Sequence, residues 1–201
     1  MKSLFVATGN PHKTGEIRSM LGDAYDVSDM TAHPHLPLPE ETGETFEANA
    51  TIKALAASSA LPDALVLSDD SGLEVDALGG APGVISARYA GANATDSDNR
   101  RLLKEQLAQL AKQTETPLFN GRFRCCMVLA QNGRVLGVFD GAVEGCLLLA
   151  EDGGGGFGYD PLFVPEGYEN SFGVLPLEVK NQLSHRSRAL AKVVAWLAEQ
   201  A

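Results

Sequence analysis

The sequence predicts an α/β protein with a mixed central β-sheet flanked by helices, and three observations support this fold class. Apolar runs of strand length alternate with segments whose apolar residues have helical spacing. The first apolar run, residues 4–7, leads directly into a helix start signal at Asn10-Pro11. Asn132-Gly133 separates two strand-like segments, which is a strong signal for an antiparallel hairpin. Strands therefore mix with helices throughout the chain.

In the first third of the chain, element boundaries follow from apolar spacing and from residues that stop helices. Ile17, Met20 and Leu21 have helical spacing, and Gly22 follows them as a stop signal. The expected elements are a strand over 2–7, a helix over Pro11–Leu21, a proline-broken loop over 32–39, an alanine-rich helix from Thr45 to about Ala60 and a short strand over Leu65–Ser68.

The remaining elements follow from a leucine pattern and from the hairpin signal. Leu102, Leu103, Leu107 and Leu110 have the spacing of an amphipathic helix, and Ser184 is a suitable N-cap for a closing helix. The expected elements are a helix over Ser97–Gln113, hairpin strands over Phe123–Ala130 and Arg134–Phe139, a third strand over Ala142–Ala150 and a helix over Ser184–Glu199.

Length and composition are typical of a globular protein. The chain has 201 residues, of which 44% are hydrophobic and 21% are charged, and it shows no internal repeat. We expect a single domain over residues 1–201, with two lobes. The sequence has no apolar stretch of membrane-spanning length and no signal-peptide pattern. Its three cysteines suit reduced thiols, so we expect a cytoplasmic protein.

The net charge of −10 bears on the kind of partner. A protein that grips DNA or RNA non-specifically normally has a basic patch, so we expect no nucleic-acid partner and no membrane partner. A small anionic ligand is compatible with this charge, because a few cations and a bound divalent metal can reverse the local field.

The segment Thr8-Gly9-Asn10-Pro11-His12-Lys13 has the features of an anion site. Asn10 is a suitable N-cap, and Pro11 suits the first helical position. Helix N-termini bind phosphate through backbone N–H groups and the helix dipole, and Lys13 adds a positive charge. The alternative is an ordinary strand-to-helix turn, because short glycine motifs are weak signals alone.

The acidic residues before the alanine-rich helix could hold a metal ion. Mg²⁺ favours one or two carboxylates with phosphate oxygens and water, and Glu40 and Glu41 offer two. Asn49 and Lys53 lie four residues apart and share one face of that helix. A lysine on a packed helix requires either exposure or an anionic partner. The alternative is a solvated acidic loop.

Asp69 and Asp70 follow the short strand at 65–68, and we expect a turn at Ser71-Gly72. Consecutive strand residues point to opposite faces, so one carboxylate can face a cleft while the other anchors the turn. Adjacent carboxylates repel one another and gain from a nearby metal or lysine. The alternative is an Asx-type turn without a chemical role.

A glycine-rich segment could receive a flat ligand. Gly153–Gly156 precede Phe157-Gly158-Tyr159-Asp160, and glycines let the backbone approach a ligand closely. An aromatic ring of this segment could stack on a nucleobase. Lys180, His185 and Arg186 follow and offer hydrogen-bond donors. The alternative is a flexible loop followed by the start of a surface helix.

Together these segments describe a nucleotide site with a magnesium-assisted step, and they also resemble a known family. ATGNPHK, ETGETFEANATIKA, DDSGLEVDALGGAPGVISARYAG, GFGYDPLF and VKNQLSHRSRA are similar to segments of the inosine/xanthosine triphosphate pyrophosphatases. Those enzymes remove deaminated purine nucleotides. The segments occur in order over almost the whole chain.

The resemblance implies a homodimeric, Mg²⁺-dependent enzyme that hydrolyses ITP, dITP and XTP to the monophosphate and pyrophosphate. It also implies an elongated sheet with two lobes around a substrate cleft. The implied roles are triphosphate binding by Thr8 to Lys13 with Lys53 assisting, metal binding by Glu40 and Asp70, general base catalysis by Asp70 with Asp69 as second candidate, and nucleotide contacts by Ser71, Phe157, Gly158, Tyr159, Asp160, Lys180, His185 and Arg186. The choice between Glu40 and Glu41 as metal ligand stays open.

One position departs from the family pattern. The family has Phe-x-Glu-Asn-Ala where this chain has Phe46-Glu47-Ala48-Asn49-Ala50. One residue turns a helical side chain by about 100°, so Glu47 is not a simple substitute for the acid that Ala48 replaces.

Selectivity for the base follows from hydrogen-bond polarity. Hypoxanthine and xanthine have an acceptor oxygen at position 6, where adenine has an amino donor. Donors from His185 and Arg186 would pair with the oxygen and reject the amino group. We therefore expect Arg186 to contribute to discrimination between ITP and ATP.

Two other functions fit parts of the pattern. A related pyrophosphatase could act on other modified nucleotides, and a non-catalytic sensor could bind a nucleotide without turnover. The sensor would not need Asp69, Asp70 and two lysines together. Magnesium-dependent turnover distinguishes it from an enzyme.

Overall fold

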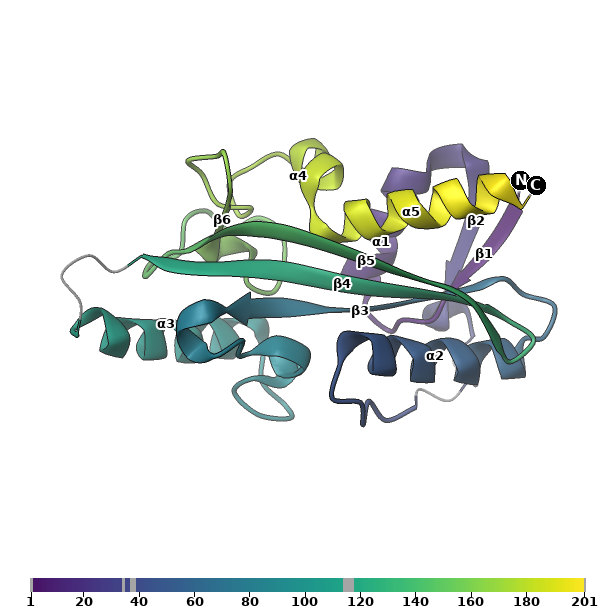
Figure 1. Cartoon of the computed structure of the whole chain (residues 1–201), viewed down its shortest axis with the longest axis horizontal. Coiled ribbons are helices and arrows are strands. Elements are labelled where there is room, and N and C mark those ends of the chain that lie inside the picture. The colour runs from purple at the N-terminus through teal and green to yellow at the C-terminus, as the bar shows by residue number, and fades with distance from the viewer. Residues whose placement is uncertain (1, 34, 37–38, 114–117, 201) are drawn as a thin grey trace. The chain divides into compact units, whose positions relative to one another are not determined.

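The computed structural model describes residues 2–33, 35–36, 39–113 and 118–200, and it has the predicted α/β fold with a mixed sheet flanked by helices (Figure 1). The strands are β1 (Lys2–Val6), β2 (Tyr25–Asp29), β3 (Val66–Val75), β4 (Phe119–Gln131), β5 (Arg134–Leu147) and β6 (Phe163–Pro165). The α-helices are α1 (Pro11–Leu21), α2 (Phe46–Ala60), α3 (Asp96–Ala111), α4 (Leu177–Leu183) and α5 (His185–Glu199). None of these helices has the length and hydropathy that a membrane span requires.

The sheet contains both strand orientations. Its order in the described residues is β2-β1-β3-β4-β5-β6. β1 runs parallel to β2 and to β3, whereas β5 and β6 are antiparallel. Asn132 and Gly133 connect β4 to β5 with backbone φ angles of 49° and 69°, so the predicted hairpin is confirmed.

The described residues form two compact units, each with its own hydrophobic core. Unit 1 contains the residues up to Ser71, Cys125–Gly141 and the residues from His185 on. Unit 2 contains Gly72–Arg124 and Ala142–Ser184. The single domain over residues 1–201 stays a prediction.

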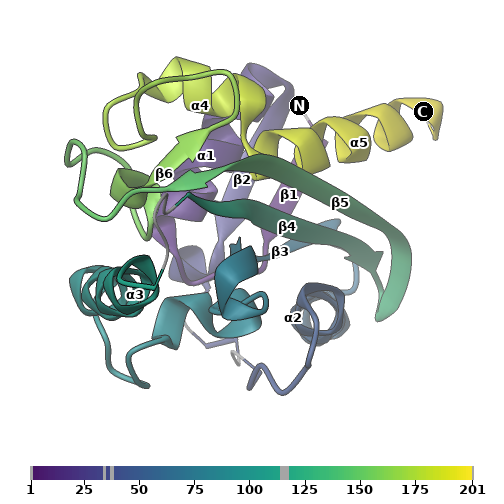
Figure 2. The ribbon, with the colours of Figure 1, turned by 60° about the vertical axis from the view of Figure 1, so that its left-hand side comes forward.

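In unit 1, α1 and α5 cover one face of the sheet and α2 covers the other (Figures 1 and 2). The alternation of β1 fits this arrangement, because Leu4 and Val6 pack in the core cluster that contains residues of α1 and α5. Phe5 pairs with Val66 of β3, and both pack on the opposite face with Ala57 of α2. Helices therefore bury both faces of this part of the sheet.

The helix α1 has the predicted boundaries, since it begins at Pro11 and ends at Leu21. The Asn10 side chain accepts hydrogen bonds from the backbone N–H groups of His12 and Lys13, as an N-cap does. Gly22 follows the helix with a φ of 55°, which glycine adopts without steric cost.

The strand β3 is longer than predicted, and the turn expected at Ser71-Gly72 was wrong. The strand continues through this segment to Val75, and residues 66–70 are buried. Ser, Asp and Gly have low strand propensity, but pairing within the sheet overrides this preference.

The third strand predicted over Ala142–Ala150 was also wrong, because Ala142–Leu147 continues β5 without interruption. The strand crosses α5 closely at Gly141. A Cβ atom there would lie 2.1 Å from the backbone carbonyl oxygen of His185 and 2.6 Å from the nitrogen of Ala189. Gly141 therefore does not end a strand. It allows β5 to pass close to the backbone of α5.

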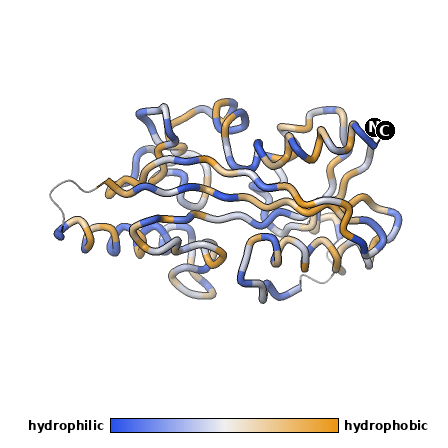
Figure 3. Tube along the Cα trace, in the orientation of Figure 1, coloured by the Kyte–Doolittle hydropathy of each residue, from blue (hydrophilic) through white to orange (hydrophobic). Residues whose placement is uncertain are grey.

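Unit 2 is built around aromatic side chains. Phe123 and Phe163 have ring centroids 4.7 Å apart, and Phe172 stacks on Phe163. Leu103 and Leu107 of α3 pack in the same cluster, which confirms the predicted amphipathic helix. In Figure 3, hydrophobic and hydrophilic residues alternate along α3.

Several elements were not predicted. β2, β6 and α4 are short, and their sequences contain few of the signals used above. Of the predicted loop at 32–39, Pro34, Pro37 and Leu38 lie outside the described residues. Ala32 belongs to a 3₁₀ turn, Met30–Ala32. The closing helix is confirmed, with Ser184 immediately before its first residue.

Candidate active site

The strand β3 directs Asp69 and Asp70 to opposite faces of the sheet in unit 1. Asp69 lies two residues after Leu67 and therefore points to the same face of the sheet, where Leu67 packs with the core on the α1 and α5 side. Asp70 points to the same face as Val66 and Ser68. The Ser68 hydroxyl donates to the Ala50 carbonyl of α2, so this is the α2 side. The two carboxylates therefore have different neighbours, as their adjacency in a strand predicts.

Asp69 is completely buried and lies among cationic and polar donors. The Lys13 ammonium forms an ion pair with it, and Arg186 donates from Nε to Asp69 Oδ2 over 3.0 Å. The Cys125 thiol donates to Asp69 Oδ2 and the Ser71 hydroxyl donates to Oδ1. Burial alone would raise the pKa of this carboxyl, but Arg186 and then Lys13 hold it well below its ordinary value. Asp69 is therefore a fixed anion.

Arg186 is only 1% exposed, and its guanidinium is occupied by protein groups. It donates to Asp69, to Glu16 of α1 and, over 2.9 Å from Nη2, to the Ser71 hydroxyl. Its predicted role as a reader of the base stays a prediction, and in this structure its guanidinium already donates to these protein acceptors. No sequence signal pointed to the partner Glu16, which is one of many helical acids.

Lys53 bridges two carboxylates. Its ammonium donates to Glu41 Oε1 over 2.7 Å, to Asp70 Oδ1 over 3.2 Å and to the Asp69 carbonyl over 2.9 Å. Of the two alternatives expected for this lysine, exposure or an anionic partner, the structure has the second, because Lys53 is buried and paired. Burial lowers its pKa, but Asp70 and then Glu41 outweigh burial and raise it. Of the two predicted acids, Glu41 contacts Lys53, whereas Glu40 is exposed.

Asp70 has the properties of a metal ligand. It is 5% exposed, and its Oδ2 is buried without a hydrogen-bond partner among the described residues. A buried carboxylate oxygen without a partner is costly, so an added ligand there is favourable. The described residues contain no cluster of three or more His, Cys, Asp or Glu side chains with metal-binding geometry. Asp70 with Glu41 nevertheless fits Mg²⁺, which takes one or two carboxylates together with phosphate oxygens and water.

The pKa of Asp70 is raised, in contrast to that of Asp69. Burial is the main cause, and the nearby Lys53 and then Lys13 only partly offset it. A carboxylate with a raised pKa accepts a proton more readily. The adjacent acids thus have different chemical properties because they face different sides of one strand.

The predicted phosphate segment is already ordered by its own side chains. Asn10 Oδ1 accepts from the His12 nitrogen over 2.9 Å and from the Lys13 nitrogen over 3.4 Å, and Thr8 Oγ1 accepts from the Asn10 nitrogen. Pro11, His12 and Gly9 are exposed. A phosphate at this helix start would share donors with Asn10, and its binding there stays a prediction.

The predicted nucleotide residues of unit 2 have different surroundings. Tyr159 is 4% exposed, packs in the aromatic core and donates its hydroxyl to the Ser86 carbonyl, so it is poorly placed to stack on a ligand. Phe157 is half-buried, and the Lys180 ammonium lies 4.6 Å from its ring centroid. Asp160 accepts from that ammonium over 2.6 Å and from the Phe157 nitrogen over 2.8 Å. Phe157 is therefore the better stacking candidate.

Packing within the protein explains part of the glycine run before Phe157, although a Cβ on Gly154 would meet no atom within 4 Å. A Cβ atom on Gly153 would lie 2.4 Å from the carbonyl oxygen of Gly173. A Cβ atom on Gly156 would lie 2.1 Å from a carboxylate oxygen of Asp160. Both glycines also have positive φ angles. Neither close approach requires a ligand, and approach of a ligand to this segment stays a prediction.

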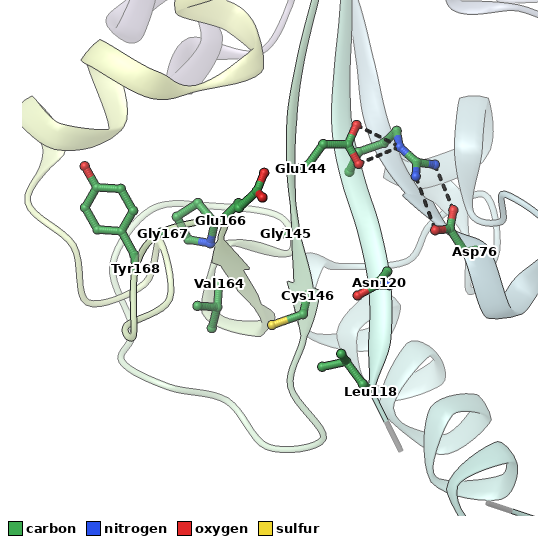
Figure 4. Close-up of a pocket in the computed structure, with 12 residues that line it drawn as sticks. Asp76, Leu118, Asn120, Glu144, Gly145, Cys146, Val164, Glu166, Gly167 and Tyr168 are labelled. Carbon is green, nitrogen blue, oxygen red and sulfur yellow. Dashed lines mark hydrogen bonds and ion pairs between the residues drawn. The ribbon is translucent and has the colours of Figure 1, made fainter. Parts of the chain in front are cut away.

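A pocket of about 540 Å³ lies elsewhere in unit 2 (Figure 4). Arg122 donates to both Asp76 and Glu144, and Glu166 also lines the pocket, so its wall carries more negative than positive groups. Cys146 and Tyr168 also line it. None of the predicted site residues contributes to this wall.

The profile of the Ham1 family matches residues 4–196, which includes all the site residues above. The chain belongs to the Ham1 family. A dITP/XTP pyrophosphatase of Exiguobacterium sibiricum is 44% identical over 196 residues, covering 96% of each chain. A dITP/XTP pyrophosphatase of Streptomyces coelicolor is 41% identical over 99% of this chain and 98% of its own. The Staphylococcus aureus Ham1 protein has a similar structure, with a TM-score of 0.85, 35% identity and complete coverage of both chains.

Ala48, where this Ham1 family chain departs from the family pattern, lies beside the loop that precedes α2. A Cβ atom on Gly43 would lie 2.7 Å from that of Ala48, so position 48 packs against the loop that carries Glu40 and Glu41. Glu47 is exposed. Burial, then Asp140 and Glu47, raise the pKa of the Cys126 thiol to about 12, so Glu47 lies near that strand residue. Glu47 therefore does not join Asp70 and Glu41.

Proposed function

We propose that this member of the Ham1 family hydrolyses ITP, dITP and XTP to the nucleoside monophosphate and pyrophosphate. Relatives that are about 40% identical over nearly the whole chain are named dITP/XTP pyrophosphatases. The observation that carries the proposal is the contrast between the two neighbouring carboxylates. Asp69 is a neutralised, fixed anion, whereas Asp70 keeps a buried oxygen without a partner beside Lys53.

Asp70 is the proposed general base. Its Oδ2 has no hydrogen-bond partner among the described residues, so that oxygen is available to accept a proton, while Lys53 fixes Oδ1. Asp69, the second candidate from sequence, is less suited because Arg186 and Lys13 stabilise its anion. Its proposed part is to hold Lys13 at the start of α1.

The proposed cofactor is Mg²⁺, with Asp70 and Glu41 as its protein ligands. Bound there, the ion would neutralise charge that develops on the phosphate oxygens. Glu41 replaces Glu40 in this proposal because Glu41 shares Lys53 with Asp70. The ammonium groups of Lys13 and Lys53 add electrostatic stabilisation of the transferred group.

Base recognition is proposed for a subset of the residues that the sequence indicated. Phe157 is proposed to stack on the purine, with Lys180 and Asp160 fixing its ring and backbone. His185 stays the predicted donor to the 6-oxo group. Arg186 instead acts through Asp69 and Glu16.

The test is pyrophosphate release from ITP, XTP, ATP, GTP and dUTP, with and without Mg²⁺. We expect turnover of ITP and XTP that EDTA abolishes. Equal turnover of all five nucleotides would contradict the proposed base recognition but keep the phosphate chemistry. No turnover with measurable ITP binding would favour a nucleotide sensor.

A further inference from the structure

The segment that carries Phe157 is held by the start of α3. Phe157 follows a run of glycines, which gives the backbone little stiffness of its own. Gly158, directly after it, has a φ of 59° and is therefore in the left-handed region. An aromatic ring on such a segment stacks on a ligand at lower entropic cost when the backbone is already fixed.

Two side chains of α3 hold both ends of the Gly158 backbone. Asp96 Oδ2 accepts from the Gly158 N–H over 2.7 Å, and Arg100 Nη1 donates to the Gly158 carbonyl over 2.8 Å. Asp96 and Arg100 lie four residues apart, so they share one face of the helix. Each hydrogen bond involves a charged side chain and is therefore stronger than a neutral one.

The Arg100 guanidinium is itself fixed by a further ion pair. Its Nε lies 3.2 Å from Glu151 Oε2, and Lys104, one turn later on α3, lies 2.7 Å from Glu151 Oε1. The capping box of Thr95 and Asp98 holds the first turn of the helix. The Glu151 contact of Arg100 Nε is an ion pair without a hydrogen bond, and the capping box orders the turn from which Asp96 projects.

We propose that Asp96 and Arg100 are positioning residues for recognition of the purine, because they hold the Phe157-Gly158 segment in its binding conformation. This inference rests on the proposed function, in which Phe157 stacks on the base. Without the two contacts, nucleotide binding would have to order the segment and bear its conformational entropy. Loss of either contact should therefore raise KM for the nucleotide while kcat changes little.

The experiment compares Arg100→Gln with Arg101→Gln. Arg101 is the neighbouring helix residue, is well exposed and pairs only with residues of α3 among the contacts described. We expect Arg100→Gln to raise KM for ITP about tenfold, as loss of one charged hydrogen bond would. Arg101→Gln should match the wild type. Equal KM values for the two variants would overturn the inference.

Asp96 provides the second comparison. Asp96→Ala removes the acceptor for the Gly158 N–H, whereas Asp96→Asn keeps an oxygen at nearly the same place. We expect Asp96→Ala to raise KM for ITP and Asp96→Asn to restore most of the affinity. An equal rise in KM for ITP in both variants would contradict a role for this hydrogen bond.

Inorganic triphosphate separates positioning of the base from general damage to the fold. It lacks a base, so its inhibition constant should be the same in the wild type, Arg100→Gln and Asp96→Ala. Equal weakening of ITP and triphosphate binding would overturn the inference. A wild-type protein that fails to hydrolyse ITP would overturn the proposed function as well. Normal wild-type turnover, with a wild-type KM for ITP in Arg100→Gln, would overturn the inference alone.

Discussion

Asp69 and Asp70 are adjacent in the chain, yet their carboxylates have different partners and opposite pKa shifts. The strand turns consecutive side chains to opposite faces, where one meets Arg186 and Lys13 and the other meets Lys53. The sequence allowed this separation to be predicted, because alternation needs only a strand. It did not allow the assignment of partners, since Cys125 and Arg186 are distant from Asp69 along the chain.

Replacement of Asp70 by Asn should remove activity and stabilise the fold. A general base contributes about 10²–10⁴-fold to turnover, so kcat should fall by that order while ITP binding persists. Because burial raises the pKa of Asp70, the folded state binds the proton more tightly than the unfolded state does. The ionised carboxylate therefore destabilises the fold above its folded pKa, and Asn removes that cost.

The pH dependence of this variant tests the argument. Its gain in melting temperature should be present at pH 7 and should shrink as the pH falls toward the ordinary Asp value of 3.8. Calorimetry from pH 7 down to the acid limit of folding measures the difference in melting temperature.

The activity of the Asp70→Asn variant is a separate test. Wild-type turnover in this variant would remove Asp70 from the mechanism.

Arg186→Met should destabilise the protein severely rather than only alter base selectivity. It leaves Asp69 and Glu16 buried without their main cation, a loss of about 3–5 kcal/mol for a broken buried pair. Adding Glu16→Gln should recover part of this loss, because one uncompensated charge is then gone. Urea unfolding of both single variants and the double variant measures the coupling, and additive effects would contradict it.

At the scale of elements, local signals located helices better than strands. The N-cap Asn10, Pro11 and Gly22 fix α1 through contacts within a few residues, so its ends could be predicted. The ends of β3 and β5 depend on pairing with distant strands, and composition wrongly placed breaks at Asp69 and Ala142. The Gly158 contacts with α3 join residues 58 or more apart, which no local pattern reveals.

Two glycine substitutions should have opposite effects. Gly15 lies on the exposed face of α1, and beyond the helix backbone itself no atom lies within 4 Å of the place that a Cβ would take. Gly15→Ala should therefore stabilise the fold by about 0.5–1 kcal/mol. Gly43→Ala would place a Cβ 2.7 Å from Ala48 and Asn49 Oδ1 and displace the loop that carries Glu41. Gly43→Ala should lower both melting temperature and turnover, and wild-type values would contradict this packing argument.

At the scale of the whole molecule, each unit has its own core while β3, β4 and β5 contribute residues to both units. The homodimer implied by the family resemblance stays a prediction. Light scattering should give twice the chain mass of 21.2 kDa. A mass that stays at one chain across micromolar concentrations would contradict it.

The contacts of Arg186 also set an order of assembly. This residue follows Asp69 by 117 positions and Glu16 by 170. At about 5–20 residues per second, a ribosome makes Arg186 roughly 6–23 s after Asp69. Until then both acids lack their main counter-charge, and burying them would be costly. The phosphate chemistry should therefore be among the last properties that a newly made chain acquires, and stalled chains that end before α5 should release no pyrophosphate.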